Sequence, residues 1–177
     1  MPSLSEDLRN LLARTTLAAR EQAEKAVRAA LENLAVHEAA PRGHMSPEQR
    51  DLRNRLRARG RATGDERENN GTQRLDHLVA DAAYEHWHRL LFTRFLTENN
   101  LLRTDAANGY VPVTLADCDE LAPELGARNG FELACRFAGQ ILPGVFRSDD
   151  PVLALRLAPN DEVVLKTLLD ELPTEVF

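Results

Sequence analysis

Residues Leu75–Leu102, LDHLVADAAYEHWHRLLFTRFLTENNLL, are the part of the sequence that decides the expected fold. They hold four of the nine aromatic residues of the chain, Tyr84, Trp87, Phe92 and Phe95, among leucines and alanines. On a helix these apolar side chains spread over several faces, and such a helix has to be covered by other elements. We therefore predict a buried central helix over about residues 72–100.

Two further helices are expected before this segment. A long amphipathic pattern starts at the N-terminus and stops at the Pro-Arg-Gly sequence that follows residue 40. Ser46, followed by Pro47 and Gln49, begins a second helix that runs to about Arg61. We therefore expect a helical hairpin over residues 1–61. Four leucines share one face at the start of its first helix: Leu4, Leu8, Leu11 and Leu12.

The polar segment 62–71, ATGDERENNG, has no large apolar side chain and is expected to be an exposed, flexible linker. Thr72 is the expected cap of the central helix. After it, short helical patterns interrupted by proline and glycine predict a compact helical domain over residues 72–177. Because no segment alternates like a strand, the expected fold class is all-α, a multi-helix bundle around the central helix.

Composition and charge indicate whether a membrane or a nucleic acid is an expected partner. No apolar run approaches the ~18 residues that span a bilayer, and the N-terminus lacks the apolar core of a signal peptide, so we expect a cytoplasmic protein without a membrane partner. Residues 1–103 carry 17 Lys and Arg against 15 Asp and Glu, whereas residues 104–177 carry 5 against 13. Any contact with nucleic acid is therefore expected from the first half.

An arginine stripe is the strongest candidate site. Arg50, Arg53, Arg57 and Arg61 are spaced by three, four and four residues, which places them on one side of a helix. The sequence favours a helix that docks through Leu52 and Leu56 and presents these guanidinium groups to DNA phosphates, which they match with paired hydrogen bonds. A solvated face, or docking on an acidic surface of this chain or of a partner, would explain the stripe equally simply.

The sequence holds no complete set of residues for a metal site, a nucleophilic site or a phosphate-binding loop. Glu85 and His88 have the Glu-x-x-His spacing of di-iron bundles, but no second copy exists, so we expect no metal. Cys118 and Cys135 match no metal spacing and are expected to be free thiols. The four serines are interpreted as caps or turn residues, and no glycine-rich phosphate loop is present. No catalytic residue is assigned.

A family resemblance lies in the central segment. Ala83–Leu102, AYEHWHRLLFTRFLTENNLL, resembles the N-terminal region of adenine-specific DNA methyltransferases of the PglX type, which belong to BREX-like phage defence, and of type IIG restriction–modification methylases. The matching features are a tyrosine-led helix and an Arg-Phe pair followed by an acidic residue and an asparagine, here Arg94, Phe95, Glu98 and Asn99. The stretches VPVTLADCDELAP and LAPNDEVVLKTLLDELPTEVF extend the resemblance over about Thr72–Phe177.

The resemblance implies an S-adenosylmethionine-dependent adenine methyltransferase if the chain is part of a larger protein. That chemistry needs a glycine-rich cofactor loop and an Asn/Asp-Pro-Pro-aromatic loop for the flipped adenine. This chain has neither; its nearest sequence, Asp149-Asp150-Pro151-Val152, lacks the second proline and the aromatic residue. No cofactor is therefore expected in this chain. The resemblance implies that the chain is the segment upstream of a catalytic region.

Two functions are predicted from the sequence. In the first, the chain is a non-catalytic N-terminal helical module of such a methyltransferase and binds DNA, the methyltransferase core or other defence-system subunits. In the second, it is a stand-alone helical protein–protein interaction module, an adaptor or inhibitor, without DNA contact. A homodimer through the leucines of the first helix is compatible with either function.

Overall fold

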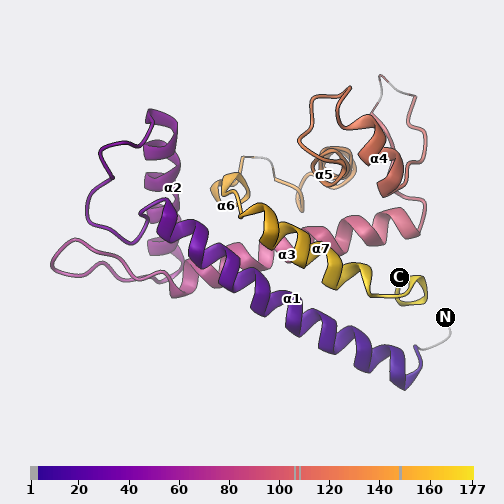
Figure 1. Ribbon diagram of the computed structural model, residues 1–177, viewed down its shortest axis with the longest axis horizontal. Helices are drawn as coiled ribbons and strands as arrows, with labels where there is room; N and C mark the ends of the chain where they lie inside the picture. The colour runs from indigo at the N-terminus through magenta and orange to yellow at the C-terminus, as the bar shows by residue number, and fades with distance from the viewer. Residues whose placement is uncertain (1–3, 106, 108, 148) are drawn as a thin grey trace. The chain divides into compact units, whose positions relative to one another are not determined.

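The computed structural model describes residues 4–105, 107, 109–147 and 149–177. In this part the chain forms helices packed against one another and no β-strand, which confirms the predicted all-α bundle. None of these helices is both long enough and apolar enough to cross a bilayer. The helices, labelled in Figure 1, are α1 (Glu6–Asn33), α2 (Pro47–Thr63), α3 (Asp76–Glu98), α4 (Leu115–Leu121), α5 (Gly130–Ile141), α6 (Pro151–Ala154) and α7 (Pro159–Asp170). The 3-10 turn η2 (Thr174–Val176) follows α7.

The chain divides into two compact units. Unit 1 consists of Met1–Thr15, His88–Ser148 and Leu169–Phe177, and unit 2 consists of Thr16–Trp87 and Asp149–Leu168. Helices α1, α3 and α7 therefore each contribute residues to both units. The predicted domain boundaries at residues 61 and 72 both fall inside unit 2.

The core of unit 1 is built from the second half of α3 together with α4, α5 and the segments that join them. Gly130, the first residue of α5, permits a close approach to α4, because a Cβ atom there would lie 2.4 Å from the backbone nitrogen of Asp119. Both cysteines are free and buried in this core. Its buried residues are Leu96, Leu102, Val113, Cys118, Leu133, Ala134, Cys135, Phe137, Ala138 and Phe146.

Local sequence signals set the starts of α4 and α5. Thr114 and Asp117 form a capping box at α4, and the Asn129 side chain accepts a hydrogen bond from the Glu132 backbone at α5. Burial raises the pKa of the Glu132 carboxyl, but hydrogen bonds from Arg128 and Arg136 outweigh it and lower this pKa to about 2. Glu132 is therefore ionised at neutral pH, and it links Arg128, just before α5, to Arg136 within α5.

Helix α3 is largely covered, as the apolar pattern predicts. Leu78, Val79, Ala82 and Ala83 are buried in unit 2, and its aromatic residues farther along are half-buried. Tyr84 is the exception, because its side chain is 49% exposed and packs edge-on against Trp87 with 5.6 Å between ring centroids.

The segment predicted to be an exposed linker contains two buried residues, Asp65 and Gly71. The Asp65 carboxylate accepts hydrogen bonds from the backbone nitrogens of His77 at 2.8 Å and Leu78 at 3.0 Å. The prediction that Thr72 caps the central helix is therefore wrong: α3 begins at Asp76, and Asp65 satisfies its first N–H groups. A cap eleven residues before the helix has no local sequence signature.

The C-terminus of α1 ends in an unusual turn. Ala35 is fully buried and has a φ of 54°, in the left-handed region that glycine usually occupies. The Val36 nitrogen donates to the Leu31 carbonyl at 2.9 Å, and the Ala35 nitrogen donates to the Glu32 carbonyl at 2.9 Å. The Ala35 carbonyl accepts from the Glu38 nitrogen at 3.1 Å, and α2 supplies further donors to the carbonyls of Ala35, Val36 and Glu38.

Candidate nucleic-acid interface on the arginine helix

Helix α2 carries the predicted arginine stripe and has well-defined ends. The Ser46 side chain accepts from the Gln49 backbone, and the Gln49 side chain accepts from the Ser46 backbone, so the predicted capping box is confirmed. Gly64 ends the helix with a φ of 117°. The 17 residues of α2 contain six arginines and only two carboxylates, Glu48 and Asp51.

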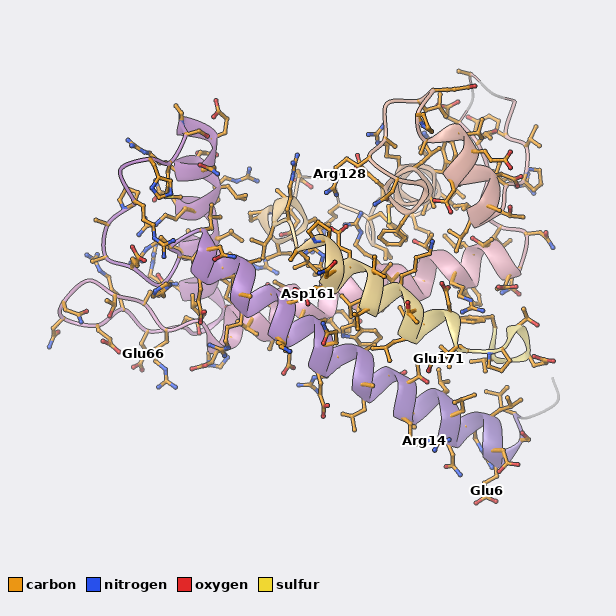
Figure 2. All side chains as sticks on the ribbon, viewed as in Figure 1. Glu6, Arg14, Glu66, Arg128, Asp161 and Glu171 are labelled. Atoms are coloured by element: carbon orange, nitrogen blue, oxygen red, sulfur yellow. The ribbon has the colours of Figure 1, made fainter. Side chains whose placement is uncertain are left out.

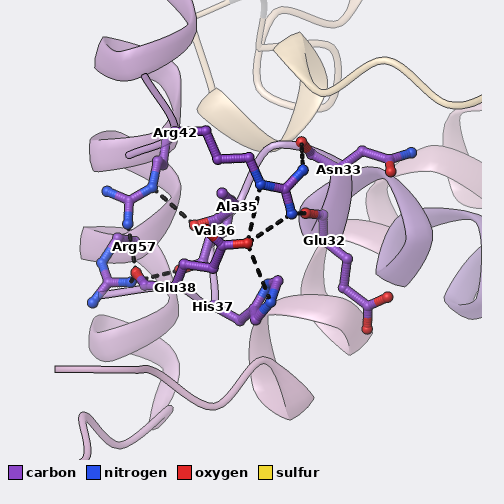
Figure 3. Close-up of polar contacts among 9 residues, drawn as sticks. Glu32, Asn33, Ala35, Val36, His37, Glu38, Arg42 and Arg57 are labelled. Atoms are coloured by element: carbon purple, nitrogen blue, oxygen red, sulfur yellow. Dashed lines mark hydrogen bonds and ion pairs between the residues drawn. The ribbon is translucent and has the colours of Figure 1, made fainter. Parts of the chain in front are cut away.

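The middle two arginines of the stripe face inward. Arg53 is 2% exposed and Arg57 is 7% exposed. Arg53 donates to the carbonyls of Ala35, at 2.8 Å, and Glu38. Arg57 donates to the carbonyls of Val36 at 2.7 Å, Glu38, and Gly71 at 2.9 Å, and Figure 3 shows it beside the chain that follows α1. The prediction that the stripe presents all its guanidinium groups outward is therefore wrong for Arg53 and Arg57.

The chain that follows α1 supplies most of the acceptors of Arg53 and Arg57, and Arg42 binds the C-terminus of α1. The last carbonyls of α1 have no partner within the helix and carry the negative end of the helix dipole, so cationic donors are favoured there. Arg42 donates to the carbonyls of Glu32 and Asn33 at 3.2 and 3.3 Å, also shown in Figure 3. Together with Arg53 and Arg57, it provides guanidinium donors to the end of α1 and to the chain that follows it.

The inward face of α2 follows helical spacing. Its members are Arg53, Leu56, Arg57 and Gly60. Gly60 lets the helix approach the start of α3, because a Cβ atom there would lie 2.7 Å from Gln73 Nε2 and 2.9 Å from Asp65 Oδ2. Periodicity identifies residues that share this face, but an arginine pair on it would ordinarily be assigned to solvent.

The outward arginines are held in place mainly by neutral acceptors. Arg50 donates to the Gly43 carbonyl at 3.2 Å, and Arg55 donates to the Asp149 carbonyl at 2.7 Å. Arg61 donates to the side-chain oxygen of Gln73 at 3.1 Å. All three residues are exposed. Arg59 differs, because it forms an ion pair with Asp81 at 2.8 Å.

The electrostatics of α2 are dominated by positive charge. Burial lowers the pKa of Arg53, and burial together with Arg53, Arg61 and Arg67 lowers the pKa of Arg57. The hydrogen bonds that Arg59 donates to the Asp81 carboxylate raise the pKa of Arg59. A carbonyl or amide oxygen satisfies guanidinium donors but does not cancel their charge. The arrangement therefore fixes the side chains while leaving a positive field around the exposed arginines.

Arg94 and Asn99, two of the residues that carry the family resemblance, lie in unit 1. Arg94 donates to the carbonyls of Leu169 and Leu172, the latter at 2.6 Å, and its guanidinium lies 5.1 Å from the ring centroid of Phe177. Asn99 donates to the Phe177 carbonyl at 3.2 Å. These contacts form an Arg94 clamp, which attaches the last nine residues to α3.

The candidate metal positions show no cluster of ligands. Within the described residues, no group of three or more His, Cys, Asp and Glu side chains is arranged to hold an ion. Asp81 is engaged by Arg59, and His86 Nε2 lies 3.0 Å from the Val152 carbonyl oxygen. Desolvation raises the pKa of the Cys118 thiol to about 11 and also raises that of Cys135. Neither thiol is therefore activated as a nucleophile.

Comparisons with known proteins give no relative: no protein-family model, no curated protein and no solved structure matches this chain.

Proposed function

We propose that this chain is a non-catalytic helical module of an adenine-specific DNA methyltransferase from a phage-defence or restriction–modification system, and that it contacts DNA through α2. The resemblance of Thr72–Phe177 to the region upstream of such enzymes supports the association with a methyltransferase. The observation that carries the DNA contact is the set of exposed arginines on α2, Arg50, Arg55 and Arg61, whose acceptors are neutral.

These three arginines replace the stripe expected from the sequence. Arg53 and Arg57 donate to backbone carbonyls and do not reach the surface. They fix α2 to the chain that follows α1, and their charge adds to the positive field of α2. Each exposed arginine donates to one neutral oxygen and has further N–H groups in its fork, so it can donate to a phosphate. Side chains that are already positioned lose less conformational entropy when they bind.

The DNA contact is tested by titrating a fluorescent duplex with the protein at several salt concentrations. Three phosphate contacts give a slope of log K against log salt of about −2.7, from ~0.9 per contact. Arg55→Glu with Arg61→Glu should reduce affinity and flatten this slope. Arg9→Glu with Arg14→Glu is the matched control, because it removes the same charge from exposed positions on α1; Arg14 projects from that helix in Figure 2.

Equal loss of affinity in both double variants would reduce the effect to net charge and remove α2 as the interface. No binding by the wild-type chain at low salt would favour the second function, an interaction module without DNA contact. The association with a methyltransferase is tested separately, by measuring N6-adenine methylation in cells whose methyltransferase system carries or lacks this segment. Unchanged methylation without it would refute that part of the proposal.

A further inference from the structure

Unit 1 carries an acidic surface on α4 and the segments beside it. Residues 104–127 contain five carboxylates and no basic residue. On α4 and the turns after it, Cys118 and Ala122 point into the core, whereas Asp117, Glu120 and Glu124 are exposed. This division is the one that helical periodicity produces, with carboxylates on the face opposite the core.

Large apolar side chains are exposed in the same stretch. Tyr110 and Val111 are both 56% exposed, and Leu125 is also exposed. Tyr110 has a φ of 55°, a conformation that costs free energy for a residue with a Cβ atom. Backbone hydrogen bonds from Thr104 to the Val111 carbonyl, at 2.9 Å, and from Val113 to the Leu102 carbonyl, at 3.0 Å, hold this segment in place. Exposed large apolar side chains with polar residues at their rim mark protein-docking surfaces, and here both kinds of residue come from the same stretch of sequence.

Charge complementarity selects the occupant of this surface. The strongest basic surface in the described chain is the outward face of α2, where Arg55 and Arg61 flank Ala58. Ala58 and Ala62 are exposed and small, so they leave room for side chains such as Tyr110 to approach the helix. We propose that the acidic surface of unit 1, formed by Asp117, Glu120, Glu124, Tyr110 and Val111, docks on the outward face of α2 in a second copy of this chain.

This contact would regulate the α2 surface. It rests on the proposed function in one respect: the arginines that contact DNA are the ones that the second copy covers. Phosphates and the carboxylates of the second copy then compete for the same guanidinium groups. Self-association therefore holds α2 in a DNA-free state, and duplex DNA at sufficient concentration separates the copies.

Self-association is measured without DNA, by sedimentation velocity of the full chain over a range of concentrations. Wild-type protein should associate at low salt and become monomeric as salt rises, because exposed charge pairs are screened beyond ~10 Å at 0.1 M. Glu120→Arg with Glu124→Arg, and separately Arg55→Glu with Arg61→Glu, should each weaken association by about tenfold or more. Glu21→Arg with Glu32→Arg, exposed acidic residues on α1, is the matched control and should associate like wild type.

The two charge-reversed proteins provide the decisive mixture. The variant with Glu120→Arg and Glu124→Arg has two basic surfaces, and the variant with Arg55→Glu and Arg61→Glu has two acidic surfaces. Each variant alone should be monomeric, while an equimolar mixture of the two should associate. Circular dichroism of each variant checks that its helices and melting temperature are retained. A wild-type chain that stays monomeric at low salt, association that ignores both reversals, or a folded mixture that fails to associate would overturn the proposal.

Adding duplex DNA separates this proposal from the proposed function. Dissociation of the oligomer into DNA-bound monomers supports the shared use of α2. An oligomer that binds DNA without dissociating overturns the shared use of α2. Salt-dependent, charge-reversible association in a chain that does not bind DNA at all would refute the proposed DNA contact alone and leave the self-association in place.

Discussion

Replacing Arg57 by methionine tests the central structural claim, that this arginine stabilises the fold rather than contacting a ligand. Methionine keeps much of the side-chain volume and removes every donor and the charge. The carbonyls of Val36 and Gly71 would lose the guanidinium that now donates to them at 2.7 and 2.9 Å. Glu38 would keep its bond from Arg53.

The expected loss of stability follows from these two acceptors. A charged hydrogen bond contributes about 1.5 kcal/mol or more, so the two lost bonds cost about 3 kcal/mol. Removing a desolvated charge that lies near Arg53, Arg61 and Arg67 returns about 1 kcal/mol. The Arg57→Met variant should therefore be less stable by about 2 kcal/mol, a large part of the 5–15 kcal/mol typical of a domain.

Urea denaturation followed by circular dichroism measures this difference. Arg61→Met is the control, because Arg61 is exposed and donates to the Gln73 side chain, so the loss of stability should stay within about 0.5 kcal/mol. Arg57→Lys should recover only part of the stability, since an ammonium keeps the charge but lacks the fork that reaches separated carbonyls. An Arg57→Met protein as stable as wild type would refute the structural role.

Three further predictions address other contacts. Gly60→Ala should lower the melting temperature, because the new Cβ would push aside the Gln73 amide, which donates to the Arg57 carbonyl at 3.0 Å, and the Asp65 carboxylate, which caps α3; the net loss is about 1 kcal/mol after the ~1 kcal/mol that alanine gains over glycine in a helix, and an unchanged melting temperature would show that these two side chains move aside without cost. Arg94→Met should loosen the last nine residues, so trypsin and chymotrypsin should cut there faster than in wild type while helix content stays the same; equal cleavage rates would contradict the Arg94 clamp. Glu132→Gln should lower stability at neutral pH but not near pH 2, because a carboxyl whose folded pKa is lowered to about 2 stabilises the fold above its unfolded pKa and loses this effect as pH falls toward 2; a stability difference that persists at pH 2 would contradict this reasoning.

The positions of several helices could be predicted from the sequence because their signals are local. Ser46 with Gln49, Thr114 with Asp117, and Asn129 each bind backbone groups within three residues, and the predicted helix start at Ser46 is confirmed. The start of α3 could not be predicted in this way, since its cap, Asp65, lies eleven residues upstream and needs the intervening turn to bring it there. Signals that depend on a folded loop are invisible to a search for local patterns.

The sequence by itself determined that the chain is helical, where α2 begins, and which arginines share a face of α2. Only the tertiary structure decided where that face points. Periodicity relates residues along one helix, but the acceptors of Arg53 and Arg57 come from residues 35–38 and Gly71, which are brought together by folding. Because the carbonyls of residues 35–38 and Gly71 accept from Arg53 and Arg57, two arginines that a helical wheel assigns to solvent are buried, and Arg50, Arg55 and Arg61 remain outside.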